Sequence, residues 1–342
     1  MRDNIHRNGS RASAFARSIG AFFTVVTTAS LAFGLMFAGH FVAGDTSEPR
    51  NLSGRETPAL ARAGGAAIAG SVMYGADAAP SLASTPISGK GMWIWLYDTI
   101  LGGDPKRIVK YAVDHGLSHI YVRSGSSNAG LRGWEDVAAI LPVAHEAGLK
   151  VIAWDFPYLR DPGADVRRAR WVLSRTVAGG HSVDGFAADV ETRSEGTVLT
   201  RTRARNYATW LRANAKGKFI VLVPPPPNSY TLTFYPYDEL VPHFDAVAPM
   251  VYWGRRAPDA YAAESIRYLK RFGKPIAPIG QSFDMGPYGG PKGPPSAGAI
   301  VRFMDRSQRD GSVGVSFWSW QHTPKYLWHT INTYRWNGAP GR

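Results

Sequence analysis

Short apolar runs recur along the chain from residue 89 onward, and more polar stretches of helical length separate them. The runs are rich in Val, Ile, Ala and Phe, and they do not alternate cleanly between apolar and polar residues. This pattern is typical of parallel strands that are covered on both faces. Eight runs are predicted to be strands, and they span residues 92–97, 119–123, 150–155, 184–191, 218–223, 244–253, 274–281 and 312–321.

The stretches between the runs carry helix start and stop signals. Asp104 followed by Pro105 is typical of an N-cap and a first helical residue, and Gly116 marks the end of that helix. Three further stretches, 134–147, 258–272 and 296–310, each end directly before a glycine. Eight strand–helix units in about 250 residues match the size of a (β/α)8 TIM barrel. The α/β domain is therefore predicted to cover residues 89–342.

An open, doubly wound sheet is the alternative arrangement of the same elements. Such a sheet would normally carry a glycine-rich phosphate-binding turn after its first strand. Residues 95–98 read Trp-Leu-Tyr-Asp instead, which favours the barrel.

Residues 1–44 have the pattern of a membrane-directed segment. The first 18 residues carry four arginines and one acid, and residues 19–42 are almost wholly apolar. At roughly 24 residues, this stretch can span a bilayer with its basic end in the cytoplasm and the rest exported. It could instead be a signal peptide cleaved before Asp45. The domain is therefore expected outside the cytoplasm, either anchored in the cell membrane or secreted.

Residues 45–88 and the overall composition add further constraints. The stretch is rich in Ala, Gly, Ser and Pro and is predicted to be a flexible linker. The absence of cysteine excludes disulfides and thiolate metal sites, and the histidines form no metal-binding motif, so no cofactor is expected. The net charge of +13 favours anionic surroundings, but no run of five Lys or Arg residues occurs, so nucleic-acid binding is not expected.

Acids, amides and aromatic residues gather at the predicted C-terminal ends of the strands, where barrel active sites lie. This convergence predicts a site for a polyhydroxylated ligand in an aromatic cup. Trp93 or Trp95 could instead fill the barrel interior, and Arg123 could pair with a buried acid. The predicted substrate-binding residues are Trp93, Trp95, Arg123, Asp155, Gln281, Asp284, Trp318, Trp320 and Gln321.

Two carboxylates stand two residues apart at the end of the fourth run. Because successive strand side chains point to opposite faces, Asp189 and Glu191 are expected to share one face. A neighbouring carboxylate and an apolar strand would raise the pKa of Glu191 and keep it protonated, as a general acid requires. A structural role, as a helix cap or as a partner of Arg193, is the alternative.

Residues 183–191 read Val-Asp-Gly-Phe-Ala-Ala-Asp-Val-Glu, which resembles the fourth-strand signature of family 18 glycoside hydrolases, the chitinase-like barrels. Residues 249–252 resemble the Met-x-Tyr that ends their sixth strand, and Trp318 matches the tryptophan near the end of their eighth. The resemblance implies a TIM-barrel glycosidase with Glu191 as the general acid/base. It also implies that Asp189 orients the 2-acetamido group of the substrate, whose carbonyl oxygen is the nucleophile, and that Tyr252 hydrogen-bonds that group.

Two positions depart from the family pattern. Ala187 stands where the family has its innermost Asp, and Trp253 stands where it has Asp after Met-x-Tyr. Both departures weaken the case for the substrate-assisted route. Asp155 or Asp284 could then be the second carboxylate of an ordinary two-acid glycosidase.

The sequence as a whole predicts an exported glycoside hydrolase-like enzyme that acts on a cell-envelope or extracellular polysaccharide. A barrel of the same family that binds glycan without cleaving it is the first alternative, and Ala187 and Trp253 favour it. The second is an envelope scaffold that binds anionic polymers through its basic surface. The expected partners are a polysaccharide or oligosaccharide and, through residues 1–44, a membrane.

Overall fold

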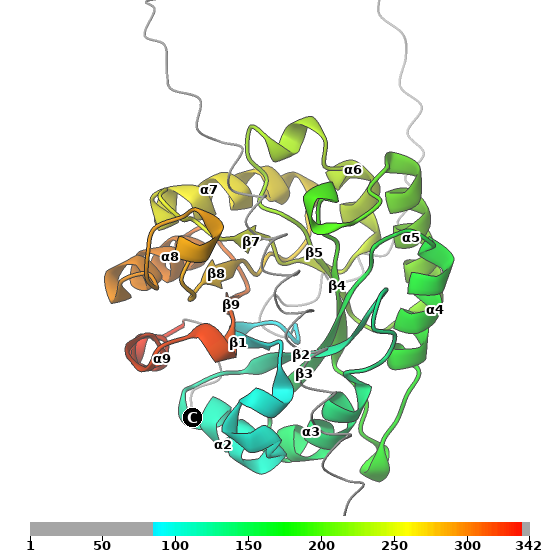
Figure 1. Ribbon diagram of the computed structural model, residues 1–342, viewed down its shortest axis with the longest axis horizontal. Helices are drawn as coiled ribbons and strands as arrows, with labels where there is room; N and C mark the ends of the chain where they lie inside the picture. Colours follow the sequence, from blue (N-terminus) through cyan, green and yellow to red (C-terminus); the bar gives the residue numbers. More distant parts are fainter. Residues whose placement is uncertain (1–84, 337–342) are drawn as a thin grey trace, which may run out of the picture.

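The computed structural model describes residues 85–336, which form a parallel β-sheet curled on itself and surrounded by helices (Figure 1). The strands pair in the order β6-β5-β4-β3-β2-β1-β9-β8-β7. They are β1 (Gly89–Ile94), β2 (His119–Ser126), β3 (Lys150–Phe156), β4 (Gly185–Asp189), β5 (Ile220–Val223), β6 (Ala246–Val247), β7 (Met250–Val251), β8 (Ile279–Gln281) and β9 (Gly314–Trp318).

The first and last strands in this order, β6 and β7, are neighbours in the sequence, and together they close the sheet into a ring. Only Ala248 and Pro249 separate β6, which pairs with β5, from β7, which pairs with β8. The Ala248 N–H donates to the carbonyl of Leu222 at 2.8 Å, and the Ile279 N–H donates to the carbonyl of Pro249 at 2.9 Å. Residues 244–253, predicted as one strand, therefore fill one position of the ring. The TIM-barrel-like α/β fold is confirmed.

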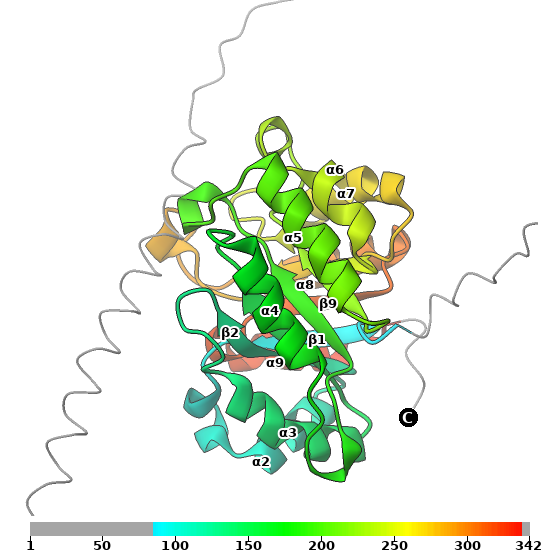
Figure 2. The same ribbon diagram turned by 90° about the vertical axis from the view of Figure 1, so that its right-hand side faces the viewer.

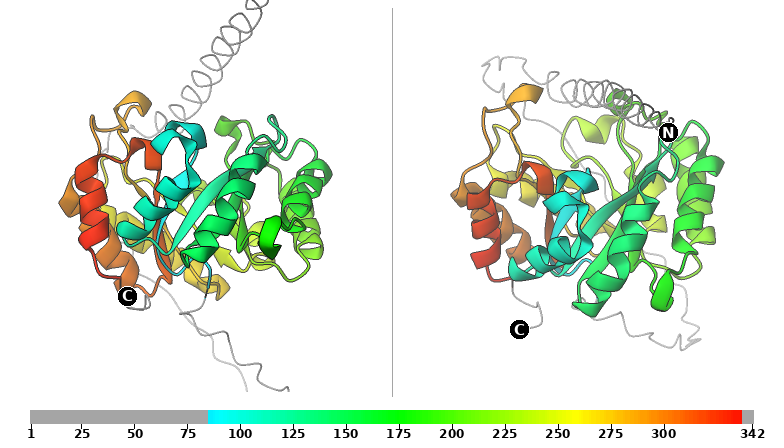
Figure 3. Two further views of the ribbon diagram at one scale, coloured as in Figure 1. Left: turned by 90° about the horizontal axis from the view of Figure 1, so that it is seen from below. Right: turned by 60° about the horizontal axis from the view of Figure 1, so that its bottom comes forward.

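In the described part of the chain, α-helices lie outside the strands, one after each position of the ring (Figures 1 and 2). The Asp104 side chain caps the first of them by accepting the N–H groups of Lys106 and Arg107, as predicted. Figure 3 shows the red C-terminal unit beside the cyan first unit, because β9 pairs with β1. The helices are α2 (Pro105–Asp114), α3 (Trp134–Glu146), α4 (Pro162–Leu173), α5 (Arg201–Asn214), α6 (Tyr237–Leu240), α7 (Pro258–Leu269), α8 (Ala297–Arg309) and α9 (Lys325–Thr333).

Strand side chains alternate between two separate apolar clusters. In β3, Ile152 and Trp154 belong to the cluster inside the barrel, whereas Val151 and Ala153 belong to the cluster between strands and helices. Because both faces are buried, the strands are apolar throughout instead of alternating with polar residues. The same alternation decides which side chains at a strand end can reach the mouth of the barrel.

Two predictions fall outside the described residues. The membrane-directed segment 1–44 and nearly all of the linker 45–88 precede residue 85, so both stay predictions. Among residues 85–336, no helix combines the length and the apolar character that crossing a bilayer requires.

Candidate active site

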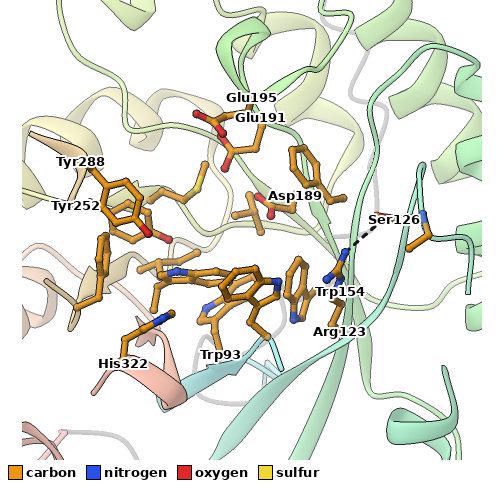
Figure 4. A pocket seen from close by; sticks show the side chains of 18 of the residues that line it. Trp93, Arg123, Ser126, Trp154, Asp189, Glu191, Glu195, Tyr252, Tyr288 and His322 are labelled. Carbon is orange, nitrogen blue, oxygen red and sulfur yellow. Dashed lines mark hydrogen bonds between the residues drawn. The ribbon is translucent and has the colours of Figure 1, made fainter. Parts of the chain in front are cut away.

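A cavity of about 770 Å³ lies at the C-terminal ends of the strands (Figure 4). Every position of the ring contributes a strand residue or one that directly follows a strand. This is the end of the barrel at which active sites lie, and ligand sites are typically of roughly 300–1,000 Å³. The strand residues in its wall are Trp93, Arg123, Ser126, Trp154, Phe156, Asp189, Val223, Met250, Ile279 and Trp318.

Three of the four carboxyl groups in the cavity wall lie on or shortly after β4, and the fourth is that of Asp284. Asp189 is the last residue of β4. Glu191 lies past the end of the strand, although the sequence predicted that the strand would extend to it. Glu195 ends the short helical turn η5 (Arg193–Glu195). Asp189, Glu191 and Glu195 are all buried. Figure 4 shows Glu191 and Glu195 close together above Asp189. One buried oxygen of each of these three carboxyl groups has no hydrogen-bond partner among the described residues.

Burial raises the pKa of each of these carboxyl groups. The pKa of Asp189 rises to about 8, through burial first and then through the nearby charges of Glu195 and Asp155. Burial raises the pKa of Glu195 to about 7. The pKa of Glu191 is raised well above its usual value by burial, and further by Asp189 and Glu195. A carboxylic acid that keeps its proton near neutral pH is what a general acid needs.

Tryptophan rings form the opposite wall. The Trp318 ring centroid lies 5.6 Å from that of Trp154 and 5.9 Å from that of Trp93. Trp95 is 6.3 Å from the same ring. Trp93 is also stacked on Tyr121 at 4.0 Å inside the barrel, so it both fills the interior and lines the cavity. Rigid aromatic faces of this kind offer apolar contact area at a low entropic cost.

Tyr252 directly follows β7 and is buried in the cavity wall. Its ring packs edge-on against Phe283 with the centroids 5.3 Å apart. Burial, and then the charges of Asp189 and Glu191, raise the pKa of its hydroxyl well above the usual value. The hydroxyl therefore keeps its proton, and it lies near enough to both carboxyl groups to sense their charge.

Asp155 does not reach the cavity, and its predicted role must be corrected. Because Trp154 points into the barrel, Asp155 on the same strand points out of it. There Arg168 of α4 binds its two carboxylate oxygens at 2.6 and 2.7 Å. Asp155 is neither a substrate contact nor a second carboxylate of this cavity.

Trp320 is also outside the cavity, although it lies two residues after Trp318 and would share its face if the strand continued. Strand β9 ends at Trp318, so alternation no longer governs Trp320, which begins the turn η10 (Trp320–His322). Its ring packs against Trp328 at 4.8 Å and Tyr111 at 5.4 Å in the helical layer. The prediction that Trp320 binds substrate is therefore wrong.

Gln281 and Gln321, which were predicted to bind substrate, instead hydrogen-bond the backbone around the mouth of the barrel. Gln281 accepts the N–H of Gly254 through Oε1 at 3.0 Å. The Gln321 side chain donates from Nε2 to the carbonyl of Leu96 at 2.8 Å. Neither lines the cavity, because a buried amide at a strand end finds partners in the neighbouring backbone.

Asp284 does line the cavity, at the start of the loop 286–295. Its Oδ1 accepts the N–H groups of Gly286 and Gly293, both at 2.7 Å. Tyr288 from the same loop is part of the cavity wall. One oxygen of Asp284 is therefore committed to shaping the rim loop, which leaves it poorly suited as a catalytic base.

The two departures from the family pattern have different surroundings. Ala187 is fully buried in the interior cluster, one inward position below Asp189. Trp253 belongs to the outer cluster and packs against Phe303 of α8 at 5.4 Å. Position 253 therefore contributes no group to the cavity, whereas position 187 leaves a methyl group beneath Asp189.

Glu195 and Trp154 are the main cavity residues that sequence reasoning missed. Glu195 lies in the polar stretch Thr-Arg-Ser-Glu, beyond the strand, where no periodicity indicates direction. A signal for Trp154 did exist, because counting inward positions from Ile152 selects Trp154 and rejects Asp155.

No protein-family model and no curated protein matches the chain, but solved structures do. A chitinase from Chromobacterium violaceum matches with a TM-score of 0.54 and 11% identity, over 72% of this chain and 100% of that one. A class V chitinase from Pseudomonas fluorescens gives 0.50 and 13%, over 72% and 99%. The endo-β-1,4-mannanase from Thermotoga petrophila gives 0.52 and 12%, over 73% and 77%.

The chain has the fold of the barrel glycosidases. The predicted resemblance to the chitinase-like barrels is thereby confirmed for the fold. In this barrel the wall offers carboxyl groups that can hold or release a proton, and aromatic rings that can stack on a sugar. Within residues 85–336, no three His, Asp or Glu side chains are grouped in a way that could hold a metal ion.

Proposed function

We propose that this protein is a divergent, chitinase-like glycoside hydrolase in which Glu191 is the general acid/base. One observation carries the proposal: a buried Glu191, with its pKa raised and one oxygen unpartnered, faces an aromatic cavity at the strand ends. The fold shared with chitinases and a mannanase supports it. The substrate would be a polysaccharide of the cell envelope or of the extracellular space.

In the proposed reaction, Glu191 gives its proton to the glycosidic oxygen as the bond from that oxygen to the anomeric carbon breaks. On an N-acetylated sugar, the acetamido oxygen could attack the anomeric carbon, with Asp189 and Tyr252 orienting that group. Both side chains lie in the cavity wall, as that route requires. Ala187 leaves Asp189 without the inner carboxyl partner that the family provides.

Glu195 is the second carboxyl group we assign to this site. Asp155 is bound by Arg168, and Asp284 shapes the rim loop. Glu195 lines the cavity and has one oxygen without a hydrogen-bond partner among the described residues. Its pKa of about 7 lets it ionise more readily than Asp189, whose pKa is about 8. In this role Glu195 would take the proton of the attacking water, or attack the anomeric carbon itself.

The test is hydrolysis of oligosaccharides labelled at the reducing end, from chitin-like, mannan-like and uronide series. Full-length wild type should cleave at least one series, and Glu191→Gln should lower kcat by a factor of about 10³ or more. Glu146→Gln, an exposed change at the end of α3, is the matched control and should keep wild-type rates.

Two other results would overturn the proposal. Tight binding without product from either wild type or Glu191→Gln would identify a glycan-binding barrel, the alternative that Ala187 favours. Binding to anionic polymers that falls steeply with salt and ignores substitution of Glu191 and Trp318 would identify a scaffold. The export of the domain is a separate proposal, based on residues 1–44, and fractionation of cells expressing the full chain tests it.

A further inference from the structure

Arg123 places a cation inside the barrel mouth. It follows Tyr121 by two positions on β2, so the two side chains share the inner face. Tyr121 packs in the interior cluster, and Arg123 lies one step nearer the mouth, where it lines the cavity (Figure 4). Its direction is therefore set by the strand and not by a flexible loop.

Arg123 has no counterion in the part of the chain that the structure describes. Its Nη2 donates to Ser126 Oγ at 3.4 Å, and its Cζ lies 5.7 Å from the centroid of the Trp154 ring. Asp155, the residue after Trp154, forms its ion pair with Arg168. Among the ion pairs of residues 85–336, none includes Arg123. Arg123 is half-buried, and a charge that has lost part of its hydration is stabilised by an opposite charge, so the missing partner points to an anionic ligand.

A second guanidinium lies on the same wall. Arg132, in the exposed turn before α3, also lines the cavity and makes no ion pair with the described residues. Burial lowers the pKa of Arg123, and the charge of Arg132 adds to this lowering, so the two cations are close enough to repel. Two arginines that line one cavity are suited to an anionic group.

The carboxyl groups of the cavity do not balance these two cations. Asp189, with a pKa of about 8, and Glu191, with its raised pKa, are mainly protonated at neutral pH. Glu195, with a pKa of about 7, carries about half a negative charge there. Asp284 also belongs to the wall, but one further carboxyl group does not offset two arginines. The +13 charge of the chain adds a positive field.

We propose that the glycan bound here is acidic, and that Arg123, with Arg132 at the rim, binds a carboxylate or phosphate group on a sugar held against Trp154. This inference names the substrate class of the proposed glycosidase and rests on that function only in using the same cavity. A planar guanidinium can bind either anion through two parallel N–H groups.

The experiment compares tetrasaccharides that differ only in charge, by titration calorimetry against the full-length Glu191→Gln chain. One pair is a uronide and its carboxyl-reduced form. A second is an N-acetylglucosamine tetramer with and without lactyl ether carboxylates, and a third is the same tetramer with and without 6-phosphates. The acidic member of at least one pair should bind about 10-fold or more tightly than its neutral partner. The pair that responds separates carboxylate from phosphate.

Arg123→Gln, added to the same chain, should remove this preference, because the acidic member loses its charged partner. Arg267→Gln, on the exposed face of α7, is the matched control and should keep the preference. An unchanged thermal midpoint for Arg123→Gln separates ligand binding from support of the barrel.

Equal affinities within every pair, no binding of any acidic member at millimolar concentration, or a preference that survives Arg123→Gln would each overturn the inference. The comparison needs no turnover, so it is independent of the proposed function. If wild type cleaves nothing while the charge preference holds, the hydrolase proposal fails and this inference stands. If wild type cleaves a glycan while the acidic and neutral members of every pair bind equally well, the hydrolase proposal stands and only this inference fails.

Discussion

Arg168 binds both carboxylate oxygens of Asp155, at 2.6 and 2.7 Å, in the layer between β3 and α4. Its Nη2 also lies 2.9 Å from Asp165. The Asp155 side chain is only 1% exposed and that of Arg168 only 10%. This cluster fastens the strand that carries Trp154 to the helix outside it, and so supports the cavity wall without entering the cavity.

Removing Arg168 should destabilise the fold. Arg168→Met leaves the buried carboxylate of Asp155 without its partner, and the free energy of unfolding should fall by about 3–5 kcal/mol. Urea unfolding of the full-length chain measures this. Arg302→Met is the control, because its exposed pair with Asp259 at 3.7 Å should be worth at most about 1 kcal/mol. Equal losses for the two variants would contradict the role given to the buried pair.

The alkaline limb of the pH–rate profile should respond to Asp189. Burial, and then the negative charge that Asp189 acquires as the pH rises through about 8, raise the pKa of Glu191. Asp189→Asn should therefore lower that pKa. Glu191 would then lose its proton at lower pH, and the alkaline limb of kcat should move down by about one pH unit, with reduced activity. Asp114→Asn, exposed on α2, should leave the limb in place. An alkaline limb at the same pH in Asp189→Asn and wild type would mean that a group other than Glu191 determines it.

The stability of the fold should decrease as the pH rises toward 8. The pKa of Asp189 is about 8 in the fold against an ordinary value of 3.8. The stability that this group contributes is therefore fully present below about pH 4 and is lost as the pH rises through 8. Between about pH 5 and pH 8, the free energy of unfolding of wild type should fall faster than that of Asp189→Asn by about 1 kcal/mol per pH unit. Urea titrations at stepped pH measure both slopes, and parallel slopes would refute the raised pKa.

Trp318 and Trp320 should separate binding from stability. Trp318→Ala removes a ring from the cavity wall and should raise KM about 10-fold with a smaller change in the thermal midpoint. Trp320→Ala removes a ring from the helical layer and should cost about 3–5 kcal/mol of unfolding free energy, with KM changed less than about 2-fold. Paired kinetics and thermal melts test this, and the reverse pattern would contradict the placement of the two rings.

The strand positions could be predicted from the chain because each strand is buried on both faces and therefore leaves a continuous apolar run. The run at 244–253 also anticipated that β6 and β7 are one strand position. The turn chemistry of Asp104 and Pro105 located the first helix start for an equally local reason. The ends of strands were harder to predict, as β4 stops at Asp189, before Glu191.

What the sequence by itself determined is the barrel and the pair Asp189 and Glu191 at its mouth, because hydrophobic period and short motifs are local properties of the chain. The tertiary structure alone decided which polar groups face the cavity. Asp155 and Trp320 turn outward to partners on distant helices. Glu195 and Arg123 instead line the cavity, and Arg123 has no ion-pair partner among residues 85–336. Such pairings depend on residues far apart in the chain, and the preference of a buried polar group for one partner over another is settled only when the elements pack.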